Sequence, residues 1–329
     1  MKPNKIFLMI IFVSSLLGAN AQQDAQKSMY MFNMLPYNPA YAGSKECMYA
    51  VGTYRAQWIG IEGAPQTLNL NFHSPLLKQN QYAFGGSARG DKAGNTMRGN
   101  VDGYFAYRLK LMKDTKLSLG VSVGFMYYQL NIKNSKVDDK SDILLNNTPN
   151  KLLPNFGFGA YLYNPKYYIG LSVPHILSPS LREITSGVVD TFLSKQVQHF
   201  YASGGLILGK GDVMFRPSFM MRYIPEIPFS VDANMSVLLK ERIWVGATYR
   251  FGGDIYDLNS MAFKFGSGNA IVGILKFLVT PQFEVGYSYD YPLSSLNSVT
   301  SATHEILLGY NFCKDKKLRY VTPRYISYF

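Results

Sequence analysis

The side chains that most often carry catalysis or bind metals are few and scattered in this sequence. Its histidines share no spacing typical of a metal site: His73, His175, His199 and His304. His304 and Glu305 are adjacent in a stretch that resembles a strand, so their side chains are expected on opposite faces. The Gly157-Phe158-Gly159 triplet precedes no helical pattern and does not predict a phosphate-binding loop. We therefore predict no catalytic residues, no metal ion and no cofactor, and a protein that is not an enzyme.

Charged residues recur instead at alternate positions of stretches whose other positions are apolar. Two interpretations are open: an internal salt-bridge network that fills and rigidifies a barrel, or a charged pore. A narrow charged channel is more often biased to one sign, whereas these residues carry both, so the network is favoured. The residues on the polar phase are Arg55, Asp102, Arg108, Arg216, Arg222, Asp232, Arg250, Glu284, Asp290 and Glu305.

A run of aromatic and turn-forming residues opens the chain before these alternating stretches begin. The Asn-Pro and Ala-Gly pairs within it are typical of turns, and its aromatic side chains need burial. We expect residues 29–43 to pack into or across the periplasmic mouth of a barrel or to dock on a partner; a flexible leader is the remaining alternative. The candidate residues for this role are Tyr30, Phe32, Asn33, Tyr37, Asn38, Pro39, Tyr41 and Gly43.

The stretches that contain the charged residues alternate with a period of two. Between Lys116 and Tyr128 the odd positions are Leu, Val, Phe and Tyr, and most even positions are Ser or Gly. Side chains alternate between the two faces of a strand, so one face is apolar and the other is small or polar. A helix would need apolar residues three and four positions apart. The pattern predicts strands, and in a membrane barrel the apolar face meets lipid while the polar face lines the lumen.

The same pattern predicts about 14 strands, an even number, as single-chain bacterial barrels require. They lie at residues 48–58, 66–74, 81–90, 96–110, 114–131, 154–163, 166–173, 196–208, 211–223, 227–239, 242–251, 269–279, 281–291 and 302–312. The connections after even strands are tight, and the longest ones follow odd strands, at residues 132–153, 174–195 and 252–268. Since short turns are periplasmic and long loops extracellular, this parity places both mature termini in the periplasm.

The start of the chain indicates export. Lys2 and Lys5 precede an apolar run over residues 6–17, and Ala19-Asn20-Ala21 is a small-x-small cleavage site, so a signal peptide is predicted. After it, no stretch is long and apolar enough to predict a membrane-spanning helix. The charged fraction is low, at 16%, against about 25% in soluble domains. Although the net charge is +12, an exported protein is not expected to bind nucleic acid.

These observations predict an all-β protein, a single antiparallel β-barrel of a Gram-negative outer membrane. The domains are a signal peptide at 1–21, an amino-terminal segment at 22–47, the barrel at 48–312 and a basic, aromatic periplasmic tail at 313–329. The chain has two cysteines, Cys47 and Cys313. They could pair if the first and last strands meet, but spacing in sequence does not decide this.

Several motifs across the mature chain are typical of one known family. The most specific is the run from Tyr37 to Gly43. The others are Tyr30-Met31-Phe32-Asn33, Arg55-Ala56-Gln57-Trp58, Gly60, Gly63-Ala64-Pro65-Gln66-Thr67, Gly286-Tyr287-Ser288-Tyr289-Asp290, His304-Glu305-Ile306 and, more weakly, Pro323-Arg324-Tyr325. Together these motifs resemble the PorP/SprF family of type IX secretion system membrane proteins. The resemblance implies an outer-membrane barrel of the secretion or gliding machinery of Bacteroidota. It also implies partners among periplasmic and outer-membrane machinery proteins and secreted cargo with a C-terminal sorting domain.

The expected function is therefore that of a secretion-machinery barrel that engages protein partners and outer-membrane lipid. An alternative of a different class is an outer-membrane porin or transporter for small or hydrophobic solutes, which the same architecture allows. The sequence does not identify the cargo, the oligomeric state or whether the lumen is open.

Overall fold

The computed structural model describes residues 26–76, 81–131, 150–177, 180–185, 189–195, 197–225, 227–257, 262–293, 300 and 302–312. The predicted signal peptide and carboxyl-terminal tail lie outside these described residues. One large antiparallel sheet dominates the described part, and two short 3-10 helices, η1 (Tyr30–Phe32) and η2 (Pro39–Tyr41), precede it. None of the helices in the described ranges is long and apolar enough to cross a membrane.

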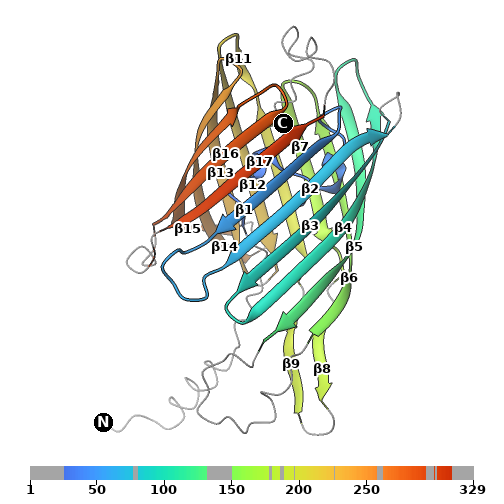
Figure 1. Ribbon diagram of the computed structural model, residues 1–329, viewed down its shortest axis with the longest axis vertical. Helices are drawn as coiled ribbons and strands as arrows, with labels where there is room; N and C mark the ends of the chain where they lie inside the picture. Colours follow the sequence, from blue (N-terminus) through green and yellow to red (C-terminus); the bar gives the residue numbers. More distant parts are fainter. Residues whose placement is uncertain are drawn as a thin grey trace.

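The sheet closes into a barrel (Figure 1). Its strands are β1 (Tyr49–Ala56), β2 (Gln66–Leu76), β3 (Tyr82–Ala93), β4 (Thr96–Lys110), β5 (Lys116–Leu130), β6 (Asn150–Tyr163), β7 (Tyr167–His175), β10 (His199–Leu206), β11 (Leu208–Lys210), β12 (Val213–Ile224), β13 (Ile227–Leu239), β14 (Ile243–Asp257), β15 (Ala262–Leu278), β16 (Phe283–Pro292) and β17 (Thr303–Asn311). Each strand pairs with its neighbour in the chain, and β7 pairs with β10. The first and last strands, β1 and β17, pair from Tyr49 opposite Asn311 to Ala56 opposite His304.

The prediction of a 14-stranded barrel is confirmed. The sheet contains 15 strands by pairing, but β10 and β11 are separated only by Ile207 and both pair with β12. Together they occupy one strand position in the barrel wall, which leaves 14 positions. The counts of 15 and 14 differ because this one strand is locally interrupted.

The two ends of the barrel differ. Tight turns join β4 to β5, β6 to β7, β11 to β12, β13 to β14 and β15 to β16, all at one end, which we call the short-turn end. The opposite, long-loop end carries a separate two-stranded sheet of β8 (Ser180–Thr185) and β9 (Val189–Lys195). In Figure 1 this hairpin projects from the lower end of the barrel.

Two of the three predicted long loops are partly strand. The stretch 174–195 contains β8 and β9, and 252–268 is largely the continuation of β14 to Asp257 and the start of β15 at Ala262. Gly252-Gly253 and Asp254 are typical turn residues, which obscured this extension, and the β14–β15 register is irregular there. Most of the third loop, 132–153, lies outside the described residues, and β6 begins at Asn150.

The outer wall is apolar and the inner wall polar, as the alternation predicts. On β5, Val121, Val123 and Phe125 are 45%, 52% and 54% exposed. Ser118 and Ser122 of the same strand, which point to the opposite face, are buried. Large apolar side chains this exposed along a whole strand would be unfavourable in water, but they suit hydrocarbon. The buried apolar core of the protein therefore cannot come from the outer wall. It lies inside the barrel, around residues 29–42.

Candidate functional site

The lumen is occupied by residues 26–47, which we call the lumen segment. At one extreme the Gln26 amide donates to Asp232 in the middle of β13 (3.1 Å). At the other, Glu46 accepts from Lys116, the first residue of β5 at the short-turn end (2.5 Å). Between these two contacts the lumen segment lies inside the barrel. We expected residues 29–43 to pack into or across a mouth of the barrel. They pack into it, and Asn38, Pro39 and Ala40 contact glycines near the short-turn ends of β5, β6 and β7.

A buried charge network surrounds the amino-terminal part of the segment. Arg55 contacts Asp290 at 2.7 Å and Glu305 at 3.1 Å. Arg250 contacts Asp232 at 2.8 Å and Asp290 at 3.3 Å. All five side chains are less than a tenth exposed, and each cation has carboxylate partners from other strands of the wall. Within this network two cations alternate with three carboxylates, so charges of both signs are interleaved rather than collected by sign.

Ser28 joins the lumen segment to this network. Its hydroxyl donates to Asp290 (2.5 Å) and accepts from Arg55 (3.0 Å) and Arg250 (3.3 Å), and its backbone N–H donates to Glu305 (2.8 Å). Hydrogen bonds to charged partners are stronger than neutral ones, at about 1.5–3 kcal/mol each. Ser28 is therefore a polar attachment of the segment at the long-loop end.

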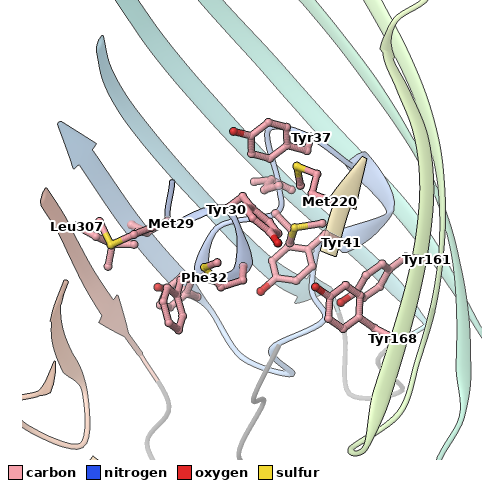
Figure 2. Packing of buried hydrophobic residues seen from close by; sticks show 14 of the residues in the cluster. Met29, Tyr30, Phe32, Tyr37, Tyr41, Tyr161, Tyr168, Met220 and Leu307 are labelled. Atoms are coloured by element: carbon pink, nitrogen blue, oxygen red, sulfur yellow. The ribbon is translucent and has the colours of Figure 1, made fainter. Parts of the chain in front are cut away.

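A few residues after Ser28, an aromatic side chain of the lumen segment contacts cationic side chains of the wall. The Arg216 guanidinium contacts both the Phe32 ring (4.5 Å to the centroid) and the Trp244 ring (4.1 Å), which pack edge to face on each other. The Lys276 ammonium also lies over the Phe32 ring, at 4.2 Å from the centroid, and it pairs with Glu284 at 2.9 Å. Such cation–π contacts are stronger where water is excluded. Figure 2 shows the neighbouring buried hydrophobic side chains, with Met29 beside Leu307.

The Asn38-Pro39-Ala40 turn fits a recess made by three glycines on adjacent strands. A Cβ added to Gly120 would lie 2.3 Å from the Ala40 nitrogen, and one on Gly159 would lie 2.1 Å from the Asn38 Oδ1. The glycines of β5, β6 and β7 therefore admit the turn where any side chain would exclude it. The three are Gly120, Gly159 and Gly170.

Asn38 fastens the turn in this recess. Its Nδ2 donates to the carbonyls of Ala160 (3.1 Å) and Leu171 (3.4 Å), while its Oδ1 accepts from the Ala40 N–H (3.0 Å) and caps η2. Pro39 at the first helical position suits a helix start because no backbone N–H is needed there. The glycine recess and the Asn-Pro-Ala sequence are therefore complementary in shape and hydrogen bonding.

The tyrosines on either side of the turn are buried against the wall. Tyr37 packs edge-on against Tyr201 at 5.2 Å between centroids, and its carbonyl accepts from the Ser172 hydroxyl at 2.7 Å. Burial raises the pKa of the Tyr37 phenol, so this side chain stays neutral. Tyr41 packs against His73 (5.3 Å) and Tyr161 (5.6 Å), as Figure 2 shows for the tyrosine pair.

Gly43 ends the buried run near the short-turn end. Its φ of +72° favours glycine, and a Cβ would lie 2.5 Å from that of Ala83. Its N–H donates to His73 Nδ1 (3.0 Å), and its carbonyl accepts from Arg108 (2.5 Å). Cys47 follows and is disulfide-bonded; the only other cysteine of the chain, Cys313, lies outside the described residues.

The structure brings most of the sequence-predicted residues together, but in separate groups. All eight candidates of the segment, Asn33 included, are buried in the lumen. Of the charged candidates, Arg108 contacts Gly43 instead of the main network. Asp102 accepts from Asn155 on another side of the lumen, and Arg222 donates to Gln26. The charges thus form several local clusters rather than one network.

Sequence reasoning missed several contributors to this site. Ser28 and Gln26 precede the aromatic run, and nothing in their surroundings distinguished them from a leader. The glycines that form the recess were interpreted only as ordinary glycines within strands. A sign was nevertheless present, because Gly120 and Gly159 occupy the inward phase of their strands, where a small residue leaves room for an occupant.

A closed barrel with a lipid-facing apolar wall defines the class: this is an outer-membrane β-barrel protein. Within the described ranges, no cluster of three or more His, Cys, Asp or Glu side chains could hold a metal ion. The profile of the type IX secretion system membrane protein PorP/SprF matches residues 19–310. The chain therefore belongs to the PorP/SprF family, as its motifs had indicated.

No curated protein matches the chain. Among solved structures, it is similar to the Acinetobacter baumannii outer membrane protein Omp33, at 11% identity and a TM-score of 0.45, over 81% of this chain and 98% of that one. It is also similar to Salmonella typhi OmpF, at 7% identity and a TM-score of 0.34, over 80% and 97%. The KdgM porin matches at 8% identity and a TM-score of 0.34, over 80% and 99%. No functional argument rests on these three likenesses.

Proposed function

We propose that this protein is a sealed barrel of the type IX secretion or gliding machinery, which engages protein partners rather than conducting solutes freely. Membership of the secretion family carries the proposal. The filled lumen supports it, because the lumen segment blocks the free passage of solutes. The same filling makes an open porin, the alternative function, less well supported.

We place the short-turn end in the periplasm and the long-loop end outside the cell, following the usual arrangement of bacterial barrels. On this orientation β17 ends on the periplasmic side, where the basic tail at 313–329 suits a contact with machinery proteins. Gln26, in contrast, lies toward the extracellular end. The proposal therefore keeps the expected periplasmic location for the carboxyl-terminal side of the barrel but not for the amino-terminal side.

The long-loop end is the side proposed to meet secreted cargo that bears a C-terminal sorting domain. The β8–β9 hairpin and the joined ends of β14 and β15 extend there. A two-stranded hairpin is marginally stable by itself, so a partner that packs on it would add stability. This supports a protein-binding role for the extracellular end.

The test is affinity purification of the tagged barrel from outer membranes, followed by mass spectrometry. We expect secretion-machinery proteins and exported proteins with sorting domains to be enriched over a tagged barrel of another family. Export is then compared between cells that express the intact protein and cells that express a variant without residues 29–43, with Gly273→Ala as a folded control. Normal export without any enriched machinery protein would reject the proposal.

A further inference from the structure

The wall that faces the lumen segment has an apolar part and a polar part. The apolar part, which includes Trp244 and Leu307, packs against residues 29–42 and favours the filled lumen. The rest of the inner wall is rich in Asn, Ser and Thr and carries buried charges, among them Arg55 and Glu305. Side chains of these kinds are stable against water as well as against the segment. The strands also pair with one another and not with the segment, so the barrel itself does not need the segment to stay closed as a sheet.

The charged pairs of the wall also persist without the segment. Arg55 keeps Asp290 and Glu305, Arg250 keeps Asp232, and every one of these groups belongs to a strand. Lys276 and Glu284 likewise pair within the wall. Ser28 adds hydrogen bonds to the network but no charge. Removing an ion's only partner is what makes a buried charge costly, and release of the segment removes none of these.

The contact between segment and wall is incompletely hydrogen-bonded. The buried Nδ2 of Asn33, the hydroxyls of Tyr161 and Ser288, and the whole side-chain amide of Asn71 have no hydrogen-bond partner among the described residues. Asn71 also lines a polar cavity beside Pro36 of the segment. Each such group would gain hydrogen bonds to water if the lumen were hydrated. The filled and hydrated states are consequently closer in free energy than a complete interface would allow.

The two ends of the segment are held differently. Its carboxyl-terminal end continues into β1 and carries the Cys47 disulfide, so it cannot leave the wall. At Gln26 and Ser28 the holding contacts are hydrogen bonds only. Between these ends, Gly43 and Glu46 have positive φ values of 72° and 59°, which marks a sharp turn of the chain. Movement out of the lumen must therefore begin at the long-loop end and pivot near residues 43–47.

We propose that the lumen segment is a hinged gate that leaves through the long-loop mouth and opens a water-filled pore for small polar solutes and ions. This activity is distinct from the secretion role, and it can be tested on the purified protein without any machinery protein. In the closed state the Ser28 hydrogen bonds and the glycine recess hold the gate. In the open state the interleaved charges of the wall line the pore.

The gate is tested by locking it with a disulfide. An ideal Cβ on Gly159 lies 3.0 Å from the Asn38 Cγ, which is about the distance from a disulfide Cβ to the far sulfur. The full-length protein carries Asn38→Cys and Gly159→Cys, with Cys47→Ser and Cys313→Ser to remove competing thiols. Ion current in KCl is recorded across a planar bilayer before and after reduction. A variant lacking residues 26–42 marks the fully open level.

We expect the oxidised protein to stay closed and reduction to raise the fraction of time open by about tenfold or more. If the oxidised and reduced proteins are equally closed while the deletion variant conducts, the segment is a fixed core and the gate is rejected. If the deletion variant is also closed, no pore exists.

The exit route has its own measurement. A cysteine at the buried position 30 (Tyr30→Cys) should react with an impermeant maleimide on whole cells several times faster when combined with Gly159→Ala than with Gly273→Ala. Equal rates would overturn release through the long-loop mouth.

Discussion

Gly159→Ala tests whether the glycine recess holds the lumen segment. The new methyl group would lie 2.1 Å from the Asn38 Oδ1 and 3.1 Å from the Pro39 Cδ, so the Asn38 side chain must move. It would then lose its hydrogen bonds to the carbonyls of Ala160 and Leu171. At about 0.5–1.5 kcal/mol each, the loss is about 1–3 kcal/mol. Local opening of the segment should become about 5- to 150-fold more frequent.

Hydrogen exchange measures this opening directly. The amides of Asn38 and Tyr41 are hydrogen-bonded within the segment, and a peptide covering residues 37–43 should exchange faster by the factor above. The matched control is Gly273→Ala, where a Cβ on the lipid-facing side of β15 meets nothing within 4 Å. Both variants share the entropic stabilisation of replacing glycine. Equal exchange of this peptide in the two variants would refute the role assigned to the recess.

Three further predictions concern the wall and its orientation. Val121→Arg places a charge against hydrocarbon at a site that is 45% exposed and should destabilise the barrel by about 2–4 kcal/mol; urea unfolding should show no such loss for Met112→Arg on an exposed turn. Asp290→Asn removes a carboxylate shared by two buried arginines; because Arg55 keeps Glu305 and Arg250 keeps Asp232, it should cost only about 1.5–3 kcal/mol, read from the same unfolding midpoint. On a background without native cysteines, Glu62→Cys should react with an impermeant maleimide on whole cells, and Lys113→Cys only after the outer membrane is opened; the reverse pattern would invert the proposed orientation.

The barrel could be predicted from sequence because its two dominant signals are local. Alternation along β5 reports which side chains face lipid, and tight turns such as the one at residues 111–115 report where neighbouring strands join. Neither signal needs knowledge of distant contacts. The extension of β14 and β15 was missed for the opposite reason, since Gly252-Gly253 suggests a turn locally while pairing between the two strands overrides it.

The filled lumen was only partly predictable. Aromatic residues of the segment indicated that it packs into or across the mouth of the barrel, but they did not indicate how deep it reaches. Depth depends on which wall residues meet across the lumen, and these come from strands far apart in the chain. Asp290 and Arg55, for example, are brought within 2.7 Å only by closure of the barrel. Ser28 has no local pattern at all, because its role exists only where that closure gathers the charges.

The two walls of the barrel differ in how strongly their surroundings constrain them. Lipid requires only that the outer wall be apolar, so many substitutions there preserve the fold. The inner wall contacts either water or a protein segment, so its residues can be complementary in shape to one particular segment. Gly120 and Gly159 illustrate this, since neither is needed for strand pairing, yet each leaves the space that Asn38, Pro39 and Ala40 occupy. The Tyr-Asn-Pro-Ala-Tyr-Ala-Gly motif is best understood as one half of that match, and the inward glycines as the other.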